Sequence, residues 1–269
     1  MAVPTFALGF PNWLDIEGIN IGGGEWLPAA QAANVATWPL AENAQTADVA
    51  PASTVIDINH FVPRAAQALI ICRHNLSATA TVRWTRGTTL GGAEVADSGA
   101  VSAWRFTPRS TGAGALYDVQ VVMQASSSAQ YDRIAITDTA NPSSYVSIGR
   151  VMICPLIAPE YAASYGLRDG HTEASTVAKG KSGAAWPDEQ DRLRTTSFAL
   201  PALTLAEGDA LHEMEQVEGT TREVAYLPYG DDPARRQRYG FTGLLRELSG
   251  LEYPHWRRRS RAFQIDQRG

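Results

Sequence analysis

The stretch Tyr131–Pro155, YDRIAITDTANPSSYVSIGRVMICP, decides the fold class of this chain. Two runs rich in β-branched and aromatic residues, 131–136 and 145–153, flank the turn-forming sequence DTANPSS. Such side chains favour strands, whereas Asp, Asn and Pro favour turns. Gly149 interrupts the second run, where we expect a bulge or a close backbone approach. The pattern predicts the closing hairpin of a β-sandwich and no catalytic motif.

Further short strand-like runs precede this stretch, and Gly, Ser, Thr, Asp and Asn fill the gaps between them. The run ALIIC at 68–72 is continuously apolar, as in a strand buried on both faces, whereas the other runs largely alternate. Many short strands at this spacing, without a convincing amphipathic helix before residue 200, predict an antiparallel jelly-roll β-sandwich. The expected strands are 54–58, 68–72, 80–85, 103–106 and 117–123.

Composition divides the chain into four parts. Residues 1–50 hold little regular pattern, and we expect an N-terminal arm and long loops that pack on the sandwich of residues 51–157. A Gly, Ser, Ala and Pro-rich stretch at 158–187 reads as a linker or long loop. Residues 188–269 are predicted to form a second, smaller, mostly-β domain with one α-helix.

The helix of that second domain is predicted at 204–218. Thr204 and Glu207 have the spacing of a capping box, and Gly219 is a suitable C-cap. Apolar side chains fall mostly on one helical face, namely Leu205, Leu211, Met214 and Val217. The accompanying strands are expected at 192–200, 222–227, 238–247 and 260–265, with a turn at 228–233.

Composition excludes several classes of protein. The 269 residues are 44% hydrophobic, which is enough for a packed core, so the chain is not disordered. The net charge of −5 argues against a dedicated nucleic-acid binder. The first residues lack the basic and apolar regions of a signal peptide, and no run approaches the length of a membrane span. We therefore expect a soluble protein, made in a cytoplasm and not inserted in a membrane.

The motifs of common enzyme classes are missing from the sequence. It contains no GxSxG, GxxxxGK[ST], HExxH or Rossmann glycine pattern, and its five histidines have no metal-ligand spacing. The glycine cluster 22–24 lacks the strand and helix that a phosphate loop needs. Cys72 and Cys154 lie in apolar strand-like runs, which favours buried thiols over a disulfide. We expect no catalysis, no cofactor and no metal.

Arginine is the unusual feature of the composition, since Lys179 and Lys181 are the only lysines. From 231 to 269 there are nine arginines against five acidic residues. A nucleic-acid patch, a solvated face and a protein interface are the alternatives; the last two fit better because Phe241 and Phe263 belong to core-like strand patterns. The candidate assembly residues are Arg235, Arg236, Arg238, Arg257, Arg258, Arg259 and Arg261.

Aromatic residues in turn-rich sequence are the other candidates for function. Their rings can stack on a sugar, or they can anchor loops onto the core. The candidate carbohydrate-binding residues are Trp26, Trp38, His74 and Trp104.

The motifs TVIDI, ALIICRHNLS and ATVRW at 54–85, with YDRIAITDTANPSSYVSIGRVMI after them, resemble galactose-binding-like (discoidin-type) jelly rolls over residues 30–157. The version they resemble occurs in virion proteins of tailed bacteriophages. The later sequences FALPALTLAEGDALHEM, GTTREVAYLPYG and YGFTGLLRELSGLEYP are similar to C-terminal domains of phage tail-tip and baseplate proteins of the distal-tail or minor-tail type.

The resemblance implies a non-enzymatic structural protein of a virion tail, assembled in the bacterial host cytoplasm. Its partners would be other tail proteins and copies of itself in a ring. The alternative is a carbohydrate-binding module that contacts host surface glycans, with its site near the four aromatic candidates.

Overall fold

The computed structural model describes residues 4–38, 40–108, 116–163, 166–173, 175–179, 185–188, 192–248, 250, 252–255 and 258–268. The chain divides into two compact units: unit 1 is Met1–Ala158 with Val224–Phe241, and unit 2 is Pro159–Glu223 with Thr242–Gly269. The division near residue 158 falls beside residue 157, the predicted end of the sandwich. Residues 224–241, expected in the second domain, instead belong to unit 1, because their strand pairs with the N-terminal strand.

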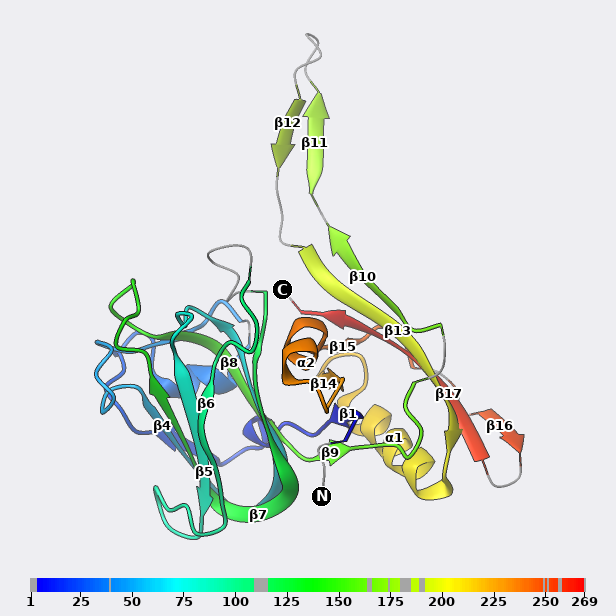
Figure 1. Ribbon diagram of the computed structural model, residues 1–269, viewed down its shortest axis with the longest axis horizontal. Coiled ribbons are helices and arrows are strands. Elements are labelled where there is room, and N and C mark those ends of the chain that lie inside the picture. Colours follow the sequence, from blue (N-terminus) through cyan, green and yellow to red (C-terminus); the bar gives the residue numbers. More distant parts are fainter. Residues whose placement is uncertain are drawn as a thin grey trace. The chain divides into compact units, whose positions relative to one another are not determined.

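Unit 1 contains an antiparallel sheet in the strand order β3-β8-β4-β7-β5-β6, with β2 paired to β4 (Figure 1). Every strand pair in it is antiparallel, as the sequence predicted. The strands are β2 (Asn20–Gly22), β3 (Ala44–Gln45), β4 (Val55–His74), β5 (Thr81–Gly87), β6 (Ala96–Ser102), β7 (Val119–Thr137) and β8 (Ser147–Cys154).

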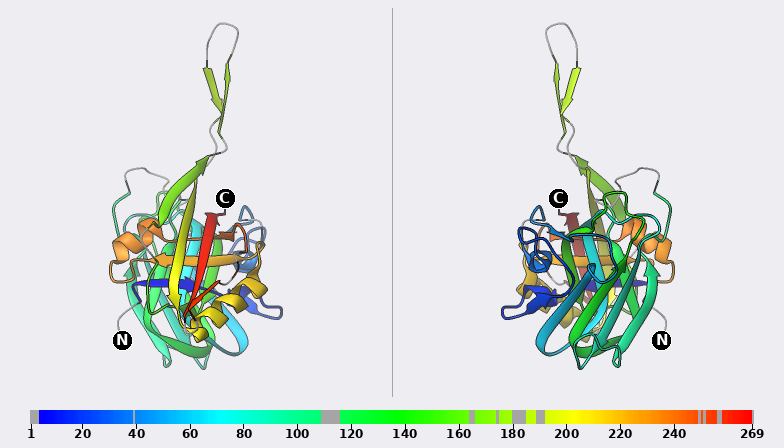
Figure 2. Two further views of the ribbon diagram at one scale, coloured as in Figure 1. Left: turned by 90° about the vertical axis from the view of Figure 1, so that its right-hand side faces the viewer. Right: turned by 90° about the vertical axis from the view of Figure 1, so that its left-hand side faces the viewer.

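The two longest strands, β4 and β7, turn this sheet into a sandwich. Their register shifts between Asn59 and Arg64 and again between Ala66 and Ala68. The first part of β4 and the last part of β7 lie with β2, β5 and β6, whereas the last part of β4 and the first part of β7 lie with β3 and β8. Each long strand therefore belongs to both layers, and Figure 2 shows the curved strands from two sides.

The core of unit 1 follows from strand alternation. Ile56 and Ile58 of β4 and Trp84 of β5 are fully buried between the layers. Farther along β4, Ile70 and Cys72 point the other way and pack against residues outside the sandwich, including Leu227. Both faces of 68–72 are thus covered, which confirms the meaning of its continuous apolar run.

Several predicted boundaries were wrong. The runs 54–58 and 68–72 are one strand, β4, and 117–123 and 131–136 lie largely in one strand, β7, because bulges bend these strands without ending them. The expected strand 103–106 is a loop, and the strand lies earlier, at β6. The expected hairpin between β7 and β8 does not form, since β4 lies between them in the sheet.

The DTANP segment instead connects the two layers, and its polar residues hold it in place. Asp138 is buried and accepts hydrogen bonds from Ser77 N (2.8 Å), from the Ser77 hydroxyl and from Asn141 Nδ2 (2.8 Å). Asn141 Nδ2 also donates to Asn75 O (3.0 Å). The two sequence motifs HNLS and DTANP therefore bind one another. Gly149 makes the expected close approach, since a Cβ there would lie 2.9 Å from Arg73 Cβ.

The N-terminal residues pack on the sandwich, as expected, and add a strand of their own. β1 (Phe6–Gly9) pairs with β14 (Glu223–Pro228) and β9 (Leu156–Ile157), and Phe6 and Leu8 are buried. Two 3₁₀ turns follow, η1 (Trp13–Asp15) and η2 (Ala32–Ala36).

A short helix, α2 (Pro233–Tyr239), follows β14 where the sequence predicted a turn and the start of a strand. Asp232 caps it by accepting from Ala234 N (3.0 Å) and Arg235 N (3.0 Å), and Pro233 occupies the first turn. Asp232 and Pro233 are both helix-start signals, although the sequence predicted a turn there.

Unit 2 is mostly β with one helix, as predicted. Its strands β10 (Arg168–Glu173), β13 (Arg192–Leu203), β17 (Arg258–Gln267) and β15 (Phe241–Leu245) are neighbours in that order, and β16 (Glu252–His255) pairs with β17. The expected linker 158–187 was wrong: it contains β10 and the separate pair β11 (Thr176–Lys179) and β12 (Ala185–Asp188). Pairing with β13 provides hydrogen-bond partners for the backbone of β10, although β10 has few apolar residues.

The helix α1 (Leu205–Glu218) begins at the predicted cap. Thr204 Oγ1 accepts from Glu207 N (3.3 Å), and Glu207 Oε2 accepts from Thr204 N (2.7 Å), which completes the capping box. Leu211 and Met214 are buried as expected, but Leu205 and Val217 are 50% and 43% exposed. The buried face therefore differs from the predicted one, since Gly208, Glu215 and Glu218 are buried with Leu211 and Met214.

Candidate functional site

Two of the four aromatic candidates meet. The His74 and Trp104 rings are in edge contact, with centroids 5.4 Å apart, and Trp104 also meets Phe106 and Tyr117. Trp104 Nε1 donates to Leu76 O (3.0 Å), so the indole anchors the loop after β6. His74 Nε2 bonds Tyr117 O (3.0 Å) while Nδ1 accepts from Leu76 N (3.2 Å), so the imidazole is neutral. Burial lowers the pKa of His74 to about 4.

The other two candidates have separate partners. Trp26 Nε1 donates to Val55 O (3.1 Å), and its ring packs against the core of the sandwich. Trp38 is stacked on Arg150, whose guanidinium carbon lies 3.9 Å from the ring centroid. Arg150 is itself buried and pairs with Asp15 (2.5 Å). Each ring therefore anchors a loop, and their role in sugar binding stays a prediction.

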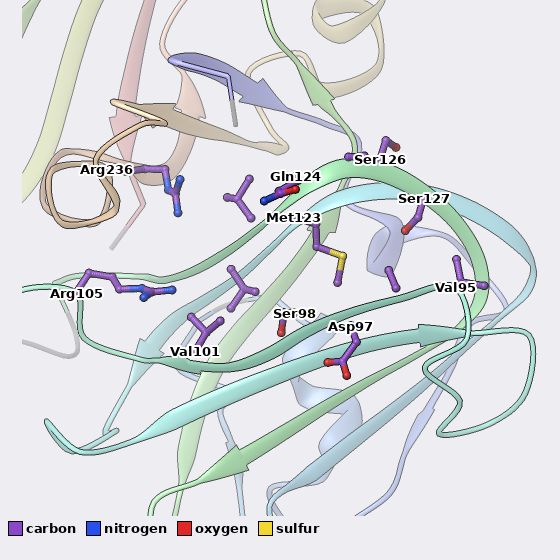
Figure 3. A pocket seen from close by; sticks show the side chains of 14 residues that line it. Val95, Asp97, Ser98, Val101, Arg105, Met123, Gln124, Ser126, Ser127 and Arg236 are labelled. Atoms are coloured by element: carbon purple, nitrogen blue, oxygen red, sulfur yellow. The ribbon is translucent and has the colours of Figure 1, made fainter. Parts of the chain in front are cut away.

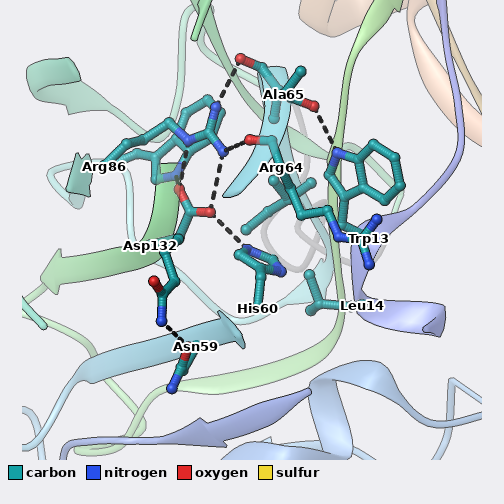
Figure 4. Close-up of polar contacts among 12 residues, drawn as sticks. Trp13, Leu14, Asn59, His60, Arg64, Ala65, Arg86 and Asp132 are labelled. Carbon is teal, nitrogen blue, oxygen red and sulfur yellow. Dashed lines mark hydrogen bonds and ion pairs between the residues drawn. The ribbon is translucent and has the colours of Figure 1, made fainter. Parts of the chain in front are cut away.

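A buried network around Asp132 has the composition of a catalytic dyad (Figure 4). Its carboxylate accepts from Trp84 Nε1 (2.7 Å) and Arg86 Nε (2.7 Å), and it lies 2.8 Å from His60 Nε2. Arg86 also donates to Arg64 O (2.8 Å) and thus gives this carbonyl a hydrogen-bond partner where β4 bends. The side chains of Asp132, Arg86 and His60 are 0% exposed, so no substrate reaches them. The network around Asp132 therefore stabilises the bend in β4.

A groove in unit 1, which we call the arginine groove, is an open candidate site (Figure 3). Its volume is about 640 Å³, within the range of small-ligand sites. β6 and β7 form its walls, and Arg105 and Arg236 project into it. The remaining side chains mix apolar surface with hydroxyl, amide and carboxylate groups; they include Val101, Met123, Asp97, Ser98, Gln124 and Ser126.

The arginine groove was not predicted from the sequence. Its lining comes from β6, the loop after β6, β7 and α2, and the residue from α2 lies more than 100 residues from the others in the chain. The available signal was Arg236, which the sequence placed among the assembly residues. The structure buries Arg236 to 4% exposure within this chain, and its place in an assembly interface stays a prediction.

The other assembly candidates have partners within their own unit. Arg261 is also buried and pairs with Glu215, which removes it from the surface. Arg235, Arg258 and Arg259 pair with Asp232, Glu160 and Asp209, and Arg238 lies over the Phe106 ring. Arg257 lies outside the described residues. Assembly through the exposed arginines stays a prediction.

Some classes of site are not found in the described part of the chain. No group of three or more His, Cys, Asp or Glu side chains there could hold a metal ion. No helix there is long and apolar enough to cross a membrane. Cys72 and Cys154 are both buried and are not joined in a disulfide.

Comparisons with known proteins find likeness at the level of the fold. No family model and no curated protein sequence matches this chain. Among solved structures, the family 32 carbohydrate-binding module of NanJ from C. perfringens, in complex with galactose, has a TM-score of 0.38 at 12% identity, over 55% of this chain and 98% of that one.

Two further structures are similar to the same extent. The fucose-binding module SpX-3 from Streptococcus pneumoniae has a TM-score of 0.37 at 10% identity, over 54% of this chain and 97% of that one. The lectin-binding domain of lectinolysin, complexed with Lewis b, has a TM-score of 0.40 at 9% identity, over 54% and 96%. All three TM-scores are below 0.5, so the ligands of these proteins are not transferred to this chain. The fold class itself is mainly β, with antiparallel sheets.

Proposed function

We propose that this chain is a non-catalytic binding protein and that unit 1 binds a glycan in the arginine groove. The single observation that carries the proposal is the groove itself. Apolar side chains such as Val101 and Met123 suit the C–H face of a sugar, while Ser98, Gln124 and Ser126 offer hydrogen bonds to its hydroxyls. The resemblance of residues 30–157 to galactose-binding-like jelly rolls supports a sugar as the ligand class.

The rigidity of the groove also supports binding. Two of its walls are strands held by neighbours in the sheet: β6 pairs with β5, and Val121, Val122 and Ser127 of β7 pair with β4. A site on paired strands keeps its polar groups in place before the ligand arrives, so little ordering is required on binding.

The test is isothermal titration of the full chain with a panel of neutral and acidic sugars. Ala125 is exposed and lines the groove, so Ala125→Trp places an indole in the site without disturbing the core. Ala100 is exposed on β6 but does not line the groove, so Ala100→Trp is the matched control. We expect saturable binding that Ala125→Trp removes and Ala100→Trp retains. Binding of no sugar, or equal binding by both variants, would contradict the proposal.

A second proposed function is the structural role in a virion tail, for which the β11–β12 pair is the favouring observation. This ribbon pairs with no other described strand, and its described side chains are all exposed, with Val177 at 58% and Trp186 at 53%. A lone two-stranded ribbon is marginal in water, and exposed apolar side chains on free strand edges are typical of contacts with another subunit. Copies of this chain and other tail proteins would be the partners.

Assembly gives this second proposal its own test. We expect the full chain to form oligomers whose mass, measured by light scattering, falls for the double variant Val177→Ser with Trp186→Ser. A chain that stays monomeric at high concentration and is absent from purified particles would contradict the structural role. Sugar binding by unit 1 would be unaffected by either result.

A further inference from the structure

Two guanidinium groups reach the same groove from different parts of unit 1. Arg105 follows β6, Arg236 lies on α2, and both side chains point into the arginine groove (Figure 3). Gln237 fixes their arrangement: its Oε1 accepts from Arg105 N (2.7 Å), and its Nε2 donates to Ala103 O (2.6 Å). The helix and the loop that carry the two arginines are therefore tied together, so the fold itself brings both side chains to the groove.

Neither arginine has an acidic partner in the part of the chain that the structure describes. Among the described residues, no ion pair involves Arg105 or Arg236. Asp97 also lines the groove, but it is engaged in a bidentate pair with Arg83, at 3.0 and 2.6 Å. An anion brought by a ligand would therefore meet two cationic groups whose charge the protein has not neutralised.

Arg236 is the more unusual of the two. It is only 4% exposed; Nη1 donates to Gly230 O (3.1 Å), while Nε is buried with no hydrogen-bond partner among the described residues. A buried guanidinium that lacks an anion and leaves a donor unused is unfavourable, and proteins keep few such groups. An oxyanion bound in the groove would supply the missing negative charge.

The charge state is consistent with this geometry. Burial lowers the pKa of Arg236 to about 10, with a further contribution from the positive charge of Arg105. Burial also lowers the pKa of Arg105. A pKa of about 10 still leaves Arg236 protonated at neutral pH, so two like charges face one groove. An anion between them would relieve their repulsion.

We infer that the arginine groove selects an anionic sugar, whose carboxylate or sulfate group lies between Arg105 and Arg236. This inference rests on the glycan-binding function proposed above and narrows its ligand class. Guanidinium groups bind planar oxyanions through paired hydrogen bonds, which gives both charge and direction. The sugar ring would extend along the wall toward Val101 and Met123, with its hydroxyls near Ser98 and Gln124.

Three sugars that differ only at C6 test the inference: galactose, galacturonate and galactose 6-sulfate. Each is titrated into the full chain by calorimetry at low ionic strength. We expect at least one anionic sugar to bind tenfold or more tightly than galactose, and to lose that advantage in high salt. Which of the two binds identifies the oxyanion as a carboxylate or a sulfate.

Arg105→Gln is the main variant because Arg105 is exposed and its loss does not threaten folding. We expect it to remove the preference for the anionic sugar over galactose. Arg235→Gln is the matched control, since it removes the same charge from the exposed face of α2, where Arg235 pairs with Asp232. It should leave the preference intact.

The outcomes separate the two levels of the proposal. Galactose binding as tightly as both anionic sugars, or an anionic preference that survives Arg105→Gln, would overturn the inference and leave the glycan-binding function standing. Failure of all three sugars, and of the wider panel, would overturn both.

Discussion

The buried Asp132 network gives the sharpest prediction about stability. The change is Asp132→Asn, which keeps the size of the side chain and removes its charge. Arg86 and His60 then remain fully buried beside a neutral amide, while Trp84 keeps at most a weaker acceptor. Removing one partner of a buried ion pair typically costs about 3–5 kcal/mol, because the other charge is left uncompensated. We expect a loss in that range.

A second pair on the same strand provides the control. Arg83 and Asp97 are 2.6 Å apart, against 2.7 Å for Arg86 and Asp132, but their side chains are 53% and 33% exposed instead of 0%. Exposed ion pairs contribute about 0–1 kcal/mol, so Asp97→Asn should be nearly neutral. The two variants thus compare two ion pairs of similar length, one buried and one exposed.

The assay is urea denaturation of the full chain, followed by tryptophan fluorescence and far-UV circular dichroism. Two probes are needed because two compact units can unfold in separate transitions. The reasoning would be refuted if Asp132→Asn lowered the free energy of unfolding by less than 1 kcal/mol, or by no more than Asp97→Asn.

Three further predictions concern local features of the two units. Thr204→Ala removes the capping box of α1 and should lower the free energy of unfolding by about 1 kcal/mol, whereas Thr220→Ala, in the exposed turn after the helix, should be neutral in the same denaturation assay. Gly24 and Gly99 both have positive φ, so replacing either by alanine should lower the free energy of unfolding by about 1–2 kcal/mol. Gly24→Ala should cost more, because its Cβ would lie 2.6 Å from a backbone oxygen. Equal shifts of the melting temperature for the two variants would contradict this. His74 has a pKa of about 4 in the fold and about 6.5 when unfolded, so between these pH values the unfolded state binds one more proton. The free energy of unfolding should therefore fall as the pH drops through this window, by up to about 1.4 kcal/mol per pH unit. His74→Gln should remove that part of the pH dependence.

Local patterns carried the prediction of much of the fold. The ALIIC run predicted a strand buried on both faces, and Thr204 with Glu207 predicted the start of α1. Both depend on neighbours a few residues apart, where side-chain alternation and capping leave a direct trace in the sequence. The strand ends were less accurate, because a bulge in β4 or β7 has the same turn-like composition as a loop.

The pairing of strands required the tertiary structure. The stretch 131–155 contains two strands, as its composition indicates, but they lie in different layers with β4 between them. A turn-rich connection has the same composition whether it joins paired strands or crosses between layers. Hydrogen bonds between Asp138, Asn141 and the HNLS segment hold this connection as a crossing between layers, and those partners are about 60 residues away.

The candidate site also depends on contacts that are distant in the sequence. The sequence by itself determined a mainly β chain with two modules, one capped helix, and an excess of arginine over lysine. Only the tertiary structure decided what those arginines do: Arg86 is neutralised by Asp132, Arg261 by Glu215, and Arg105 and Arg236 line one groove without an ion pair to any described residue. The physical reason is that the effect of a charge depends on its burial and on the sign of its neighbours, and folding sets both.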